Sequence, residues 1–578
     1  MKGYLLFDLK LAQYFLKKDH ALLFKKNILF ITDKIAIFEL FKSRNIRIIC
    51  LDNEISNKKR KKIFLYNYPY IDNKIKNFGK KNYFNFDKIK LNSIHNTNRS
   101  EVPRCYVGIK YLLYSLSNVL KKNKINEIIF FKDLYNNFLC KNFYTKVFEL
   151  FCNKKNIIFN VKKLNYSDKQ DLFISFSKIL LKILFILRNN LFNKTFIFLK
   201  TYFLNRFYKH GNRERIVYLG PLADLRYLKS KTFDKNLNKR LEFFLKKKTN
   251  QINIPKKNFK NLDDLLLCYL QKKDKINYEI YKNLISNTLK YFELKKINKI
   301  YWGISPDPLF RNLIEFLKKK NYIINGLQHG GKYFIINDDL YHKDSDYLLC
   351  NRYHSYGYTK SFNKKKYSKN TTILNTGCYK SSQYENLFKN IKKLNKDTIL
   401  YVPIQLSTFS IPVIETSPIK RFFLQKKICY ALNDINSLKK YIKILPLSYY
   451  QNIILNYKKL ESNPIYLELD KFKSLKIDSD QLTNSYKNLK PKIIIMDSLS
   501  TPLYELSNSN SEIIIFLDKH NQPKKDVLNI LKKRFYIVSD INEMISSIDL
   551  ILNRKKSKSG NKLFYNKFYK QKNFQLTK

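Results

Sequence analysis

The sequence predicts an α/β protein with two Rossmann-like domains that face each other across a cleft. Short apolar runs typical of buried strands alternate with helical periodicity along most of the chain. Two of these runs end in polar or glycine-rich loops, at residues 328–331 and 497–501, and the carboxyl ends of parallel strands are where α/β folds bind ligands. A chain of 578 residues is also too long for one core.

An N-terminal α/β region is predicted for residues 1–165. Its expected strands are residues 27–32, 46–51, 127–132 and 156–161. Helical patterns lie between these strands, and the short connections favour parallel pairing through right-handed crossovers. Residues 53–100 are rich in lysine and asparagine, and we expect them to form a mobile insertion.

Residues 166–214 form the most apolar segment of the chain. A transmembrane helix needs roughly 20 apolar residues without interruption, and here lysines and Arg188 interrupt the run at 171–204. That pattern suits an amphipathic helix lying in the membrane interface. An ordinary pair of core helices explains it equally well, so a peripheral membrane contact is one of two alternatives.

Residues 215–380 are predicted to complete the first half of the molecule, and residues 395–550 to form a C-terminal Rossmann-like domain, which the family resemblance described below makes the nucleotide-donor domain. Strand patterns in the two regions cover residues 215–220, 299–303, 322–328, 347–350, 398–403, 441–445, 492–496, 512–517 and 534–538. A lysine- and asparagine-rich stretch after Gly377 is the expected linker. Residues 554–578 are basic and lack regular periodicity, which predicts a terminal tail.

The formal net charge of +65 has two explanations. A basic surface attracts nucleic acid, anionic lipid or nucleotide-activated substrates. Alternatively the charge is mutational, because lysine, asparagine, isoleucine, tyrosine and phenylalanine are all abundant, as A/T-rich codons would produce. The lysines are scattered rather than gathered on one helix or arm, as a nucleic-acid footprint requires, so nucleic-acid binding is disfavoured.

Neither a metal site nor a cofactor is predicted. The eight cysteines include no C-x-x-C pair, and the dinucleotide and P-loop fingerprints are absent. Unpaired, scattered cysteines suit a reducing compartment. Charge breaks the N-terminal apolar run too early for a signal peptide, so we expect a cytoplasmic protein.

The first candidate site is the loop after the strand that ends near residue 328, with Gln328, His329, Gly330 and Gly331. The glycines let a ligand approach the backbone, and a histidine can act as a base or donate to a phosphate near neutral pH. Asp307, in the loop one strand earlier, would orient His329 as a general base. The alternatives are a β-turn whose histidine bonds the backbone, and helix N-capping by Asp307.

The second candidate site comprises Arg352 and the Tyr356-Gly357 pair, just past the strand at 347–350. An arginine offers a bidentate grip on phosphate, and an aromatic ring can stack on a sugar or base. A surface loop with aromatic packing is the alternative.

The third candidate site follows a buried strand and opens a helix, with Asp497, Ser498, Ser500, Thr501 and Glu505. Hydroxyls and backbone N–H groups at a helix N-terminus can hold a phosphate, and Glu505 can accept hydrogen bonds from ribose hydroxyls. The alternative is plain N-capping by Ser498, Ser500 or Thr501.

Together these motifs resemble a family of transferases from bacterial surface-carbohydrate gene clusters, of the GT-B glycosyltransferase type. That family shows Gln-His-Gly-Gly, then Arg-x-x-x-(Trp/Tyr)-Gly, then Asp-Ser-x-Ser-Thr-x-x-x-Glu. The chain supplies all three between about residues 301 and 518, and it is more distantly similar to glycerophosphotransferases. It departs from the family at Tyr356, where tryptophan is expected, and in the polar residues after Glu505.

The resemblance implies a metal-independent glycosyltransferase of lipopolysaccharide or capsule biosynthesis, acting at the inner face of the cytoplasmic membrane. Its partners would be a nucleotide-activated sugar donor and a glycan or lipid-linked acceptor. Ser498, Ser500 and Thr501 would hold the donor phosphates and Glu505 the ribose. His329 would face the reacting centre, with Arg352 offsetting leaving-group charge. A non-catalytic carbohydrate- or nucleotide-binding protein of this fold, or a basic nucleic-acid-binding protein, is the alternative.

Overall fold

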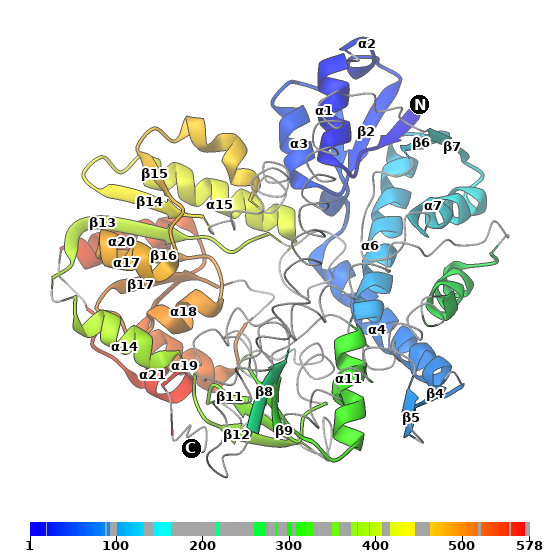
Figure 1. The fold of residues 1–578 in the computed structure, drawn as a ribbon. Coiled ribbons are helices and arrows are strands. Elements are labelled where there is room, and N and C mark those ends of the chain that lie inside the picture. Colours follow the sequence, from blue (N-terminus) through cyan, green and yellow to red (C-terminus); the bar gives the residue numbers. More distant parts are fainter. Residues whose placement is uncertain are drawn as a thin grey trace, which may run out of the picture.

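The computed structural model contains three large parallel sheets with helices packed on them (Figure 1). It thereby confirms the predicted α/β class. Apart from gaps of one or two residues, the structure describes residues 1–92, 101–131, 143–162, 215–219, 259–274, 297–302, 308–328, 349–357, 371–406, 417–444, 463–517, 522–553 and 557–572, with Ile285, Leu289 and Ile335.

The N-terminal domain is built on a five-stranded parallel sheet in the order β3-β2-β1-β6-β7. Its strands are β1 (Lys2–Leu5), β2 (Ile28–Thr32), β3 (Ile48–Cys50), β6 (Glu127–Phe131) and β7 (Ile158–Lys162). The other elements are α1 (Leu9–Lys18), α2 (His20–Leu23), α3 (Ile35–Lys42), the 3-10 helix η1 (Leu51–Glu54), α4 (Asn57–Lys81), the hairpin β4 (Tyr83–Phe86) and β5 (Ile89–Asn92), α6 (Glu101–Lys122) and α7 (Phe143–Lys154). The order is that of a Rossmann fold without its sixth strand.

Two parts of this domain differ from the prediction. The central strand β1 was not predicted, yet it pairs with β2 on one side and β6 on the other. Residues 53–100, expected to be a mobile insertion, contain the 25-residue helix α4. Its Phe64, Ile71 and Ile75 are buried in the domain core, so this helix is an integral layer of the domain.

The C-terminal domain is built on a six-stranded parallel sheet in the order β15-β14-β13-β16-β17-β18. Its strands are β13 (Asn395–Val402), β14 (Lys439–Lys443), β15 (Leu475–Asp478), β16 (Pro491–Met496), β17 (Glu512–Phe516) and β18 (Tyr536–Val538). Its helices are α15 (Pro418–Asn433), the 3-10 helix η6 (Pro464–Lys471), α17 (Leu482–Leu489), α18 (Thr501–Leu506), α19 (Lys525–Arg534) and α20 (Ile541–Leu552). This is the full Rossmann strand order, so the chain reverses its direction across the sheet between β13 and β16.

A third sheet, called the middle sheet here, lies between these domains in sequence and has the order β12-β11-β10-β9-β8. Its strands are β8 (Arg215–Leu219), β9 (Ile297–Trp302), β10 (Ile323–Leu327), β11 (Arg352–Ser355) and β12 (Thr372–Asn375), and α11 (Pro308–Lys319) connects β9 to β10. The helix α14 (Ser381–Lys389) follows it, where we expected a linker. The strands of residues 215–380 thus form their own sheet rather than extending that of residues 1–165.

Residues 259–272 belong to the N-terminal core, although the sequence assigned them to the region that starts at residue 215. Leu265 and Leu270 are buried among the side chains of that core. Asp263 accepts hydrogen bonds from the hydroxyls of Tyr70 (2.6 Å) and Tyr106 (2.7 Å). The N-terminal domain is therefore completed by a segment from far along the chain.

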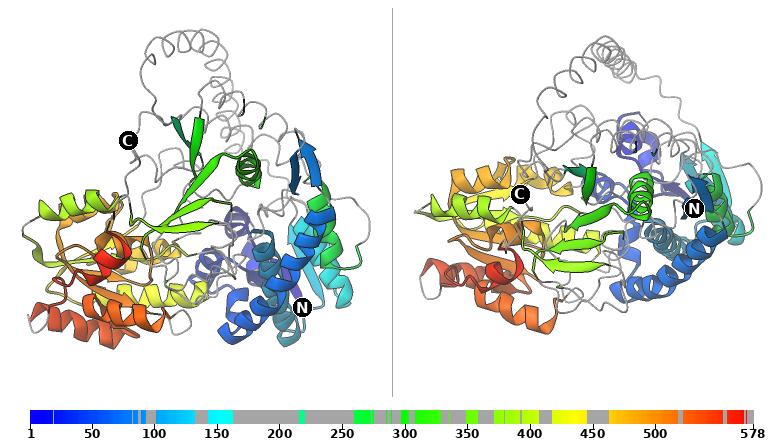
Figure 2. Two further views of the ribbon diagram at one scale, coloured as in Figure 1. Left: turned by 90° about the horizontal axis from the view of Figure 1, so that it is seen from below. Right: turned by 60° about the horizontal axis from the view of Figure 1, so that its bottom comes forward.

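Hydrophobic cores join the C-terminal domain to both of its neighbours. One core contains Ile324 of the middle sheet together with Ile494 and Leu503 of the C-terminal domain. Another contains Phe38 of α3 together with Phe422 of α15. The C-terminal domain consequently packs against the other two sheets, as the views in Figures 1 and 2 agree.

The predicted basic tail at 554–578 contains the helix α21 (Leu563–Phe568). Phe564, Tyr565, Phe568 and Tyr569 are all buried. The backbone N–H of Cys378 donates to the carbonyl of Tyr569 (2.8 Å), and that of Lys572 donates to Thr376 (2.8 Å). This segment is therefore a structural link between the C-terminal domain and the end of the middle sheet, and the tail prediction was wrong for these residues.

The apolar segment at 166–214 lies outside the described residues. Among the helices that the structure describes, none combines the length and the apolar character needed to cross a bilayer.

Candidate functional site

The loop after β16, which begins with Asp497, lies at the switch point of the C-terminal sheet. β13 and β16 are neighbours there, and Rossmann folds bind ligands at the carboxyl ends of such a pair. One carboxylate oxygen of Asp497 accepts a hydrogen bond of 2.7 Å from the backbone N–H of Ile404, which follows β13. Asp497 therefore ties together the loops on the two sides of the switch point.

The carboxylate of Asp497 is buried and its oxygens are occupied. The second oxygen accepts hydrogen bonds from the Gln425 amide (2.7 Å) and the Tyr401 hydroxyl (3.3 Å). Burial raises the pKa of this carboxyl, while the charge of Arg421 and the hydrogen bonds act in the opposite direction. These contacts argue against the predicted donor-binding role of Asp497, and they assign it the positioning of the loop.

Three hydroxyl residues, Ser498, Ser500 and Thr501, follow Asp497 where α18 begins. Ser500 is the N-cap residue of α18, but its side chain makes no capping hydrogen bond. The hydroxyl of Ser498 is buried without a hydrogen-bond partner among the described residues. A buried polar group without a partner costs free energy unless a ligand or water completes it. The contact of Ser498, Ser500 and Thr501 with a ligand stays a prediction.

Helix α18 is fixed at its far end by Arg534, which is completely buried. Its guanidinium donates hydrogen bonds of 3.0 Å to the carbonyls of Ser507, Ser509 and Ser511, and burial lowers its pKa to about 10. Glu505 is half-buried on α18, near Tyr569: burial raises the pKa of Tyr569, and the charge of Glu505 adds to that effect. Glu505, which the sequence predicts to bind the ribose, therefore lies on α18 a little more than one turn from Ser500 and near Tyr569.

Gln328 ends β10 and connects it to the segment after β11. Its side-chain oxygen accepts a hydrogen bond of 2.8 Å from the backbone N–H of Tyr356. Its backbone N–H donates a hydrogen bond of 3.0 Å to the backbone carbonyl of His354. Gln328 is only 5% exposed. Like Asp497, it holds two strand ends in register, so we assign it a positioning role.

Arg352 lies at the start of β11 and not at its carboxyl end. It pairs in register with Asn325, three residues before Gln328, which corresponds to roughly 10 Å along the strand. Its side chain is exposed. The structure therefore brings Tyr356 and Gly357 to the Gln328 end of the sheet but leaves Arg352 at the opposite end, which argues against its predicted contact with a leaving group.

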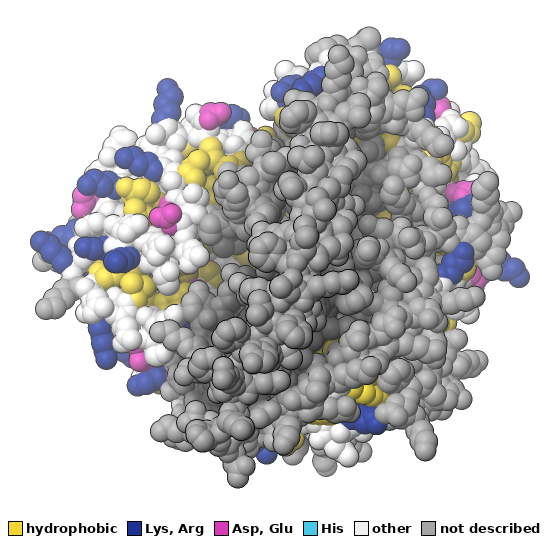
Figure 3. All heavy atoms as spheres, viewed as in Figure 1, with side chains coloured by type: hydrophobic (Ala, Val, Ile, Leu, Met, Phe, Trp, Pro, Cys, Tyr) yellow, Lys and Arg dark blue, Asp and Glu magenta, His cyan; other side chains and the backbone are white. Residues whose placement is uncertain are grey.

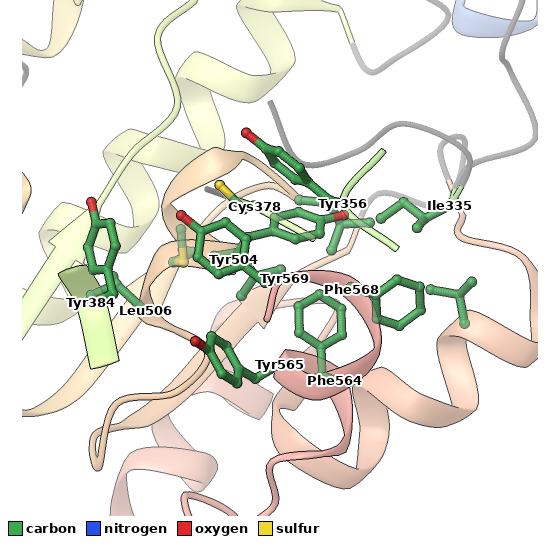
Figure 4. Close-up of a cluster of buried hydrophobic side chains, with 14 of the residues drawn as sticks. Ile335, Tyr356, Cys378, Tyr384, Tyr504, Leu506, Phe564, Tyr565, Phe568 and Tyr569 are labelled. Carbon is green, nitrogen blue, oxygen red and sulfur yellow. The ribbon is translucent and has the colours of Figure 1, made fainter. Parts of the chain in front are cut away.

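The strand ends of the middle sheet meet the C-terminal domain at Tyr569 (Figure 4). The ring of Tyr569 packs edge-on against Tyr356, which follows β11, with centroids 5.6 Å apart, and lies 6.4 Å from the ring of Tyr504 on α18. The backbone N–H of Lys524, after β17, donates to the carbonyl of Ile335 (2.9 Å), four residues past Gly331. Tyr356 of the second motif and α18 of the third thus meet at one interface between the middle sheet and the C-terminal domain, and Ile335, just past the first motif, also contacts the C-terminal domain.

The predicted chemical centre lies outside the described residues. His329, Gly330, Gly331 and Asp307 fall in gaps of the description, so their roles stay predictions. Within the described part of the chain, no group of three or more His, Cys, Asp or Glu side chains is arranged to hold a metal ion.

The sequence missed the contribution of α21 to this region. The backbone of Lys567 approaches Gly357 so closely that a Cβ at Gly357 would lie 2.3 Å from the Lys567 carbonyl oxygen, and Gly357 has a φ of +141°. Gly357 is thus needed both for its backbone conformation and for space. The available signal was the spacing of Phe564, Tyr565, Phe568 and Tyr569, which is that of one helical face.

No family model and no curated protein matches this chain. Among solved structures, it is similar to the UDP-GlcNAc 2-epimerase from Neisseria meningitidis bound to UDP-GlcNAc, with 12% identity, 62% of this chain and 95% of that chain covered, and a TM-score of 0.33. It is also similar to a glycosyltransferase from Rickettsia africae ESF-5, with 13% identity, 62% of this chain and 95% of that chain covered, and a TM-score of 0.33. The similarity to sucrose-phosphate synthase from Thermosynechococcus elongatus has 10% identity, covers 48% of this chain and 69% of that chain, and has a TM-score of 0.32. Because these TM-scores are low, the α/β fold class is assigned from the strand order described above.

Proposed function

We propose that the chain is a glycosyltransferase-like enzyme that moves a sugar or sugar-like group from a nucleotide-activated donor in bacterial surface-polysaccharide biosynthesis. The observation that carries this proposal is the position of the Asp-Ser-x-Ser-Thr motif. It was singled out from the sequence by its resemblance to a transferase family, and it follows β16 at the switch point of a sheet with the Rossmann strand order.

In this proposal the donor phosphates lie on the hydroxyls of Ser498, Ser500 and Thr501, and the ribose hydroxyls on the carboxylate of Glu505. His329, oriented by Asp307, acts as base or phosphate ligand at the reacting centre. Asp497 and Gln328 keep the two loops in place, as their internal hydrogen bonds indicate. Preorganised donors of this kind accelerate transfer by positioning reactants and stabilising developing charge.

The acceptor in the proposal is a glycan or a lipid-linked glycan, and the reaction takes place on the cytoplasmic side of the membrane. A contact of residues 171–204 with that membrane stays a prediction. The proposed chemistry derives only from residues of this chain and assigns no role to a metal ion or cofactor.

Two other functions compete with this one. A binding protein of the same fold would keep its nucleotide affinity when His329 is replaced by alanine, and would show no turnover in either form. A nucleic-acid-binding protein would show strongly salt-dependent affinity for DNA or RNA. Against the latter, the Lys and Arg side chains visible on the C-terminal domain are spread over its described surface rather than gathered in one stripe (Figure 3).

The test is thermal-shift screening of the full chain against UDP-, GDP-, CDP- and CMP-linked sugars. A ligand that binds only the folded state raises the melting temperature by mass action. We expect one nucleotide class to raise it, and Glu505→Gln and Ser498→Ala each to abolish most of that shift.

Ser509→Ala is the matched control, because the Ser509 side chain is also buried but lies in the loop that enters β17 from its amino end. It should leave the ligand-induced shift unchanged. Absence of a shift with every nucleotide sugar, or an equal loss in Ser498→Ala and Ser509→Ala, would rule out the proposed donor site.

A further inference from the structure

Helix α4 has two faces of different character. Phe64, Tyr68, Ile71 and Ile75 recur at helical spacing and are buried against the N-terminal core. The opposite face carries exposed side chains between Lys58 and Lys76. In Figure 2 the helix (blue) runs along the outer edge of the N-terminal domain.

The centre of this outer face is apolar. Leu65 is 54% exposed and Tyr66 is 75% exposed, and Pro69 is also exposed on the same side. Single exposed apolar residues are ordinary, but adjacent large ones on one helical face mark an interaction surface. The three residues are spaced so that they form one patch at the middle of the helix.

Lysines flank this patch at both ends. Lys58, Lys61 and Lys62 precede it and Lys76 follows it, and all four side chains are exposed. Within the described part of the chain none of these four makes an ion pair. Lys58, Lys62, Leu65, Tyr66, Pro69 and Lys76 share one helical face, and 18 residues from Lys58 to Lys76 correspond to roughly 27 Å.

One acidic residue shares this face. Asp72, which is half-buried, lies between Pro69 and Lys76 on it, and it is the one acidic residue in the sequence of α4, which contains nine lysines and arginines. Glu54, just before the helix, pairs with Lys122 (2.6 Å) and so does not offset the charge of Lys58. The face therefore combines an excess of positive charge with exposed apolar surface.

We propose that the outer face of α4, defined as Lys58, Lys61, Lys62, Leu65, Tyr66, Pro69 and Lys76, docks on an anionic lipid surface. Leu65, Tyr66 and Pro69 insert at the level of the headgroups, while the lysine stems extend along the interface and their ammonium groups meet lipid phosphates. Each lysine near such a surface strengthens binding, and the apolar patch adds an area-dependent contribution that salt does not screen.

The apolar centre favours lipid over nucleic acid as the occupant. A phosphate backbone needs cationic and hydrogen-bonding groups along its whole path. Leu65 and Pro69 offer neither, and their insertion into an interface removes apolar area from water. The proposal is independent of the donor site, because α4 lies in the N-terminal domain and the donor motif in the C-terminal domain.

The experiment is flotation of the full chain with vesicles of phosphatidylcholine alone or mixed with phosphatidylglycerol, at low and high salt. We expect binding to the anionic vesicles only. The variant Lys58→Glu/Lys61→Glu/Lys62→Glu should lower the partition coefficient at low salt by about 100-fold or more. The variant Leu65→Ser/Tyr66→Ser should lose the binding that persists at high salt.

The matched control is Lys532→Glu/Lys533→Glu, which reverses two exposed lysines on α19 without an exposed apolar neighbour in the same turn. It should keep vesicle binding. The proposal is overturned if the α4 variants bind vesicles like the wild type, if the α19 control loses binding equally, or if the α4 variants lose RNA binding while vesicle binding is unchanged. All variants should retain the wild-type melting temperature and any nucleotide-sugar shift, which separates this result from a failure of the donor site.

Discussion

The carboxylate of Asp52 accepts a hydrogen bond of 2.9 Å from the backbone N–H of Ile419, which joins the N-terminal domain to the start of α15. Its other oxygen pairs with the guanidinium of Arg60 at 2.6 Å, and both side chains are at most 4% exposed. Two helical turns further along α15, Gln425 holds Asp497. One helix thus connects the N-terminal sheet to the switch point of the C-terminal sheet.

Replacement of Asp52 by alanine should destabilise the protein by about 3–5 kcal/mol. The cost is large because the buried guanidinium of Arg60 would lose the carboxylate of Asp52, in addition to the lost hydrogen bond at the first turn of α15. Urea denaturation followed by circular dichroism measures the loss. Lys122→Ala is the control, because its pair with Glu54 leaves the lysine 67% exposed and should contribute less than about 1 kcal/mol. A loss for Asp52→Ala as small as that of the control would contradict the assigned role.

His354 on β11 should make stability fall as the pH drops below neutral. Burial, and then the charge of Arg352, lower its pKa to about 4. The unfolded chain binds a proton near pH 6.5 that the folded chain excludes until about pH 4, so the folded state loses up to about 3 kcal/mol between these values. In His354→Gln that component should vanish. The measurement is the slope of the unfolding free energy against pH in both proteins, and parallel slopes would show that His354 is not buried in its neutral form.

Several strands that the sequence predicted correctly have continuous apolar runs. β2, β6 and β16 are covered on both faces of parallel sheets, and such strands consist almost wholly of apolar residues. β1 escaped prediction because it has only four residues, Lys2 to Leu5, one of them glycine. Its strand conformation depends on pairing with β2 and β6, which are distant in sequence, and local patterns do not contain that information.

The candidate site was predictable in its location but not in its division of roles. The residue pattern placed Asp497 and Ser498 after a strand, and the structure puts them at a switch point. Local sequence cannot reveal that Gln425 and Arg421, more than 70 positions earlier, surround Asp497. Arg352 was misplaced because the strand was predicted at residues 347–350, which put Arg352 after its carboxyl end. In the structure β11 begins at Arg352, so the arginine lies at the amino end of the strand.

Tyr569→Ala should destabilise the interface between the middle sheet and α18 by about 3–5 kcal/mol, since it removes a fully buried ring that touches both. Tyr569→Phe keeps the ring and should change stability by less than about 1 kcal/mol. Chemical denaturation of the two variants beside the wild type is the measurement. Equal stability of the alanine and phenylalanine variants would mean that α21 does not clamp the two parts together.

Gly326→Ala should destabilise the middle sheet by about 1–3 kcal/mol, because a Cβ there would lie 2.3 Å from the Cys350 sulfur and 2.9 Å from the ring of Tyr353. Gly560→Ala is the matched control, since nothing lies within 4 Å of the Cβ position at Gly560. Adding Cys350→Ala to Gly326→Ala removes the nearest clash, so the double variant should be more stable than the two single losses predict when added together. Thermal denaturation of the four proteins measures this coupling. Strict additivity of the two changes would show that Gly326 on β10 and Cys350 are not in close contact.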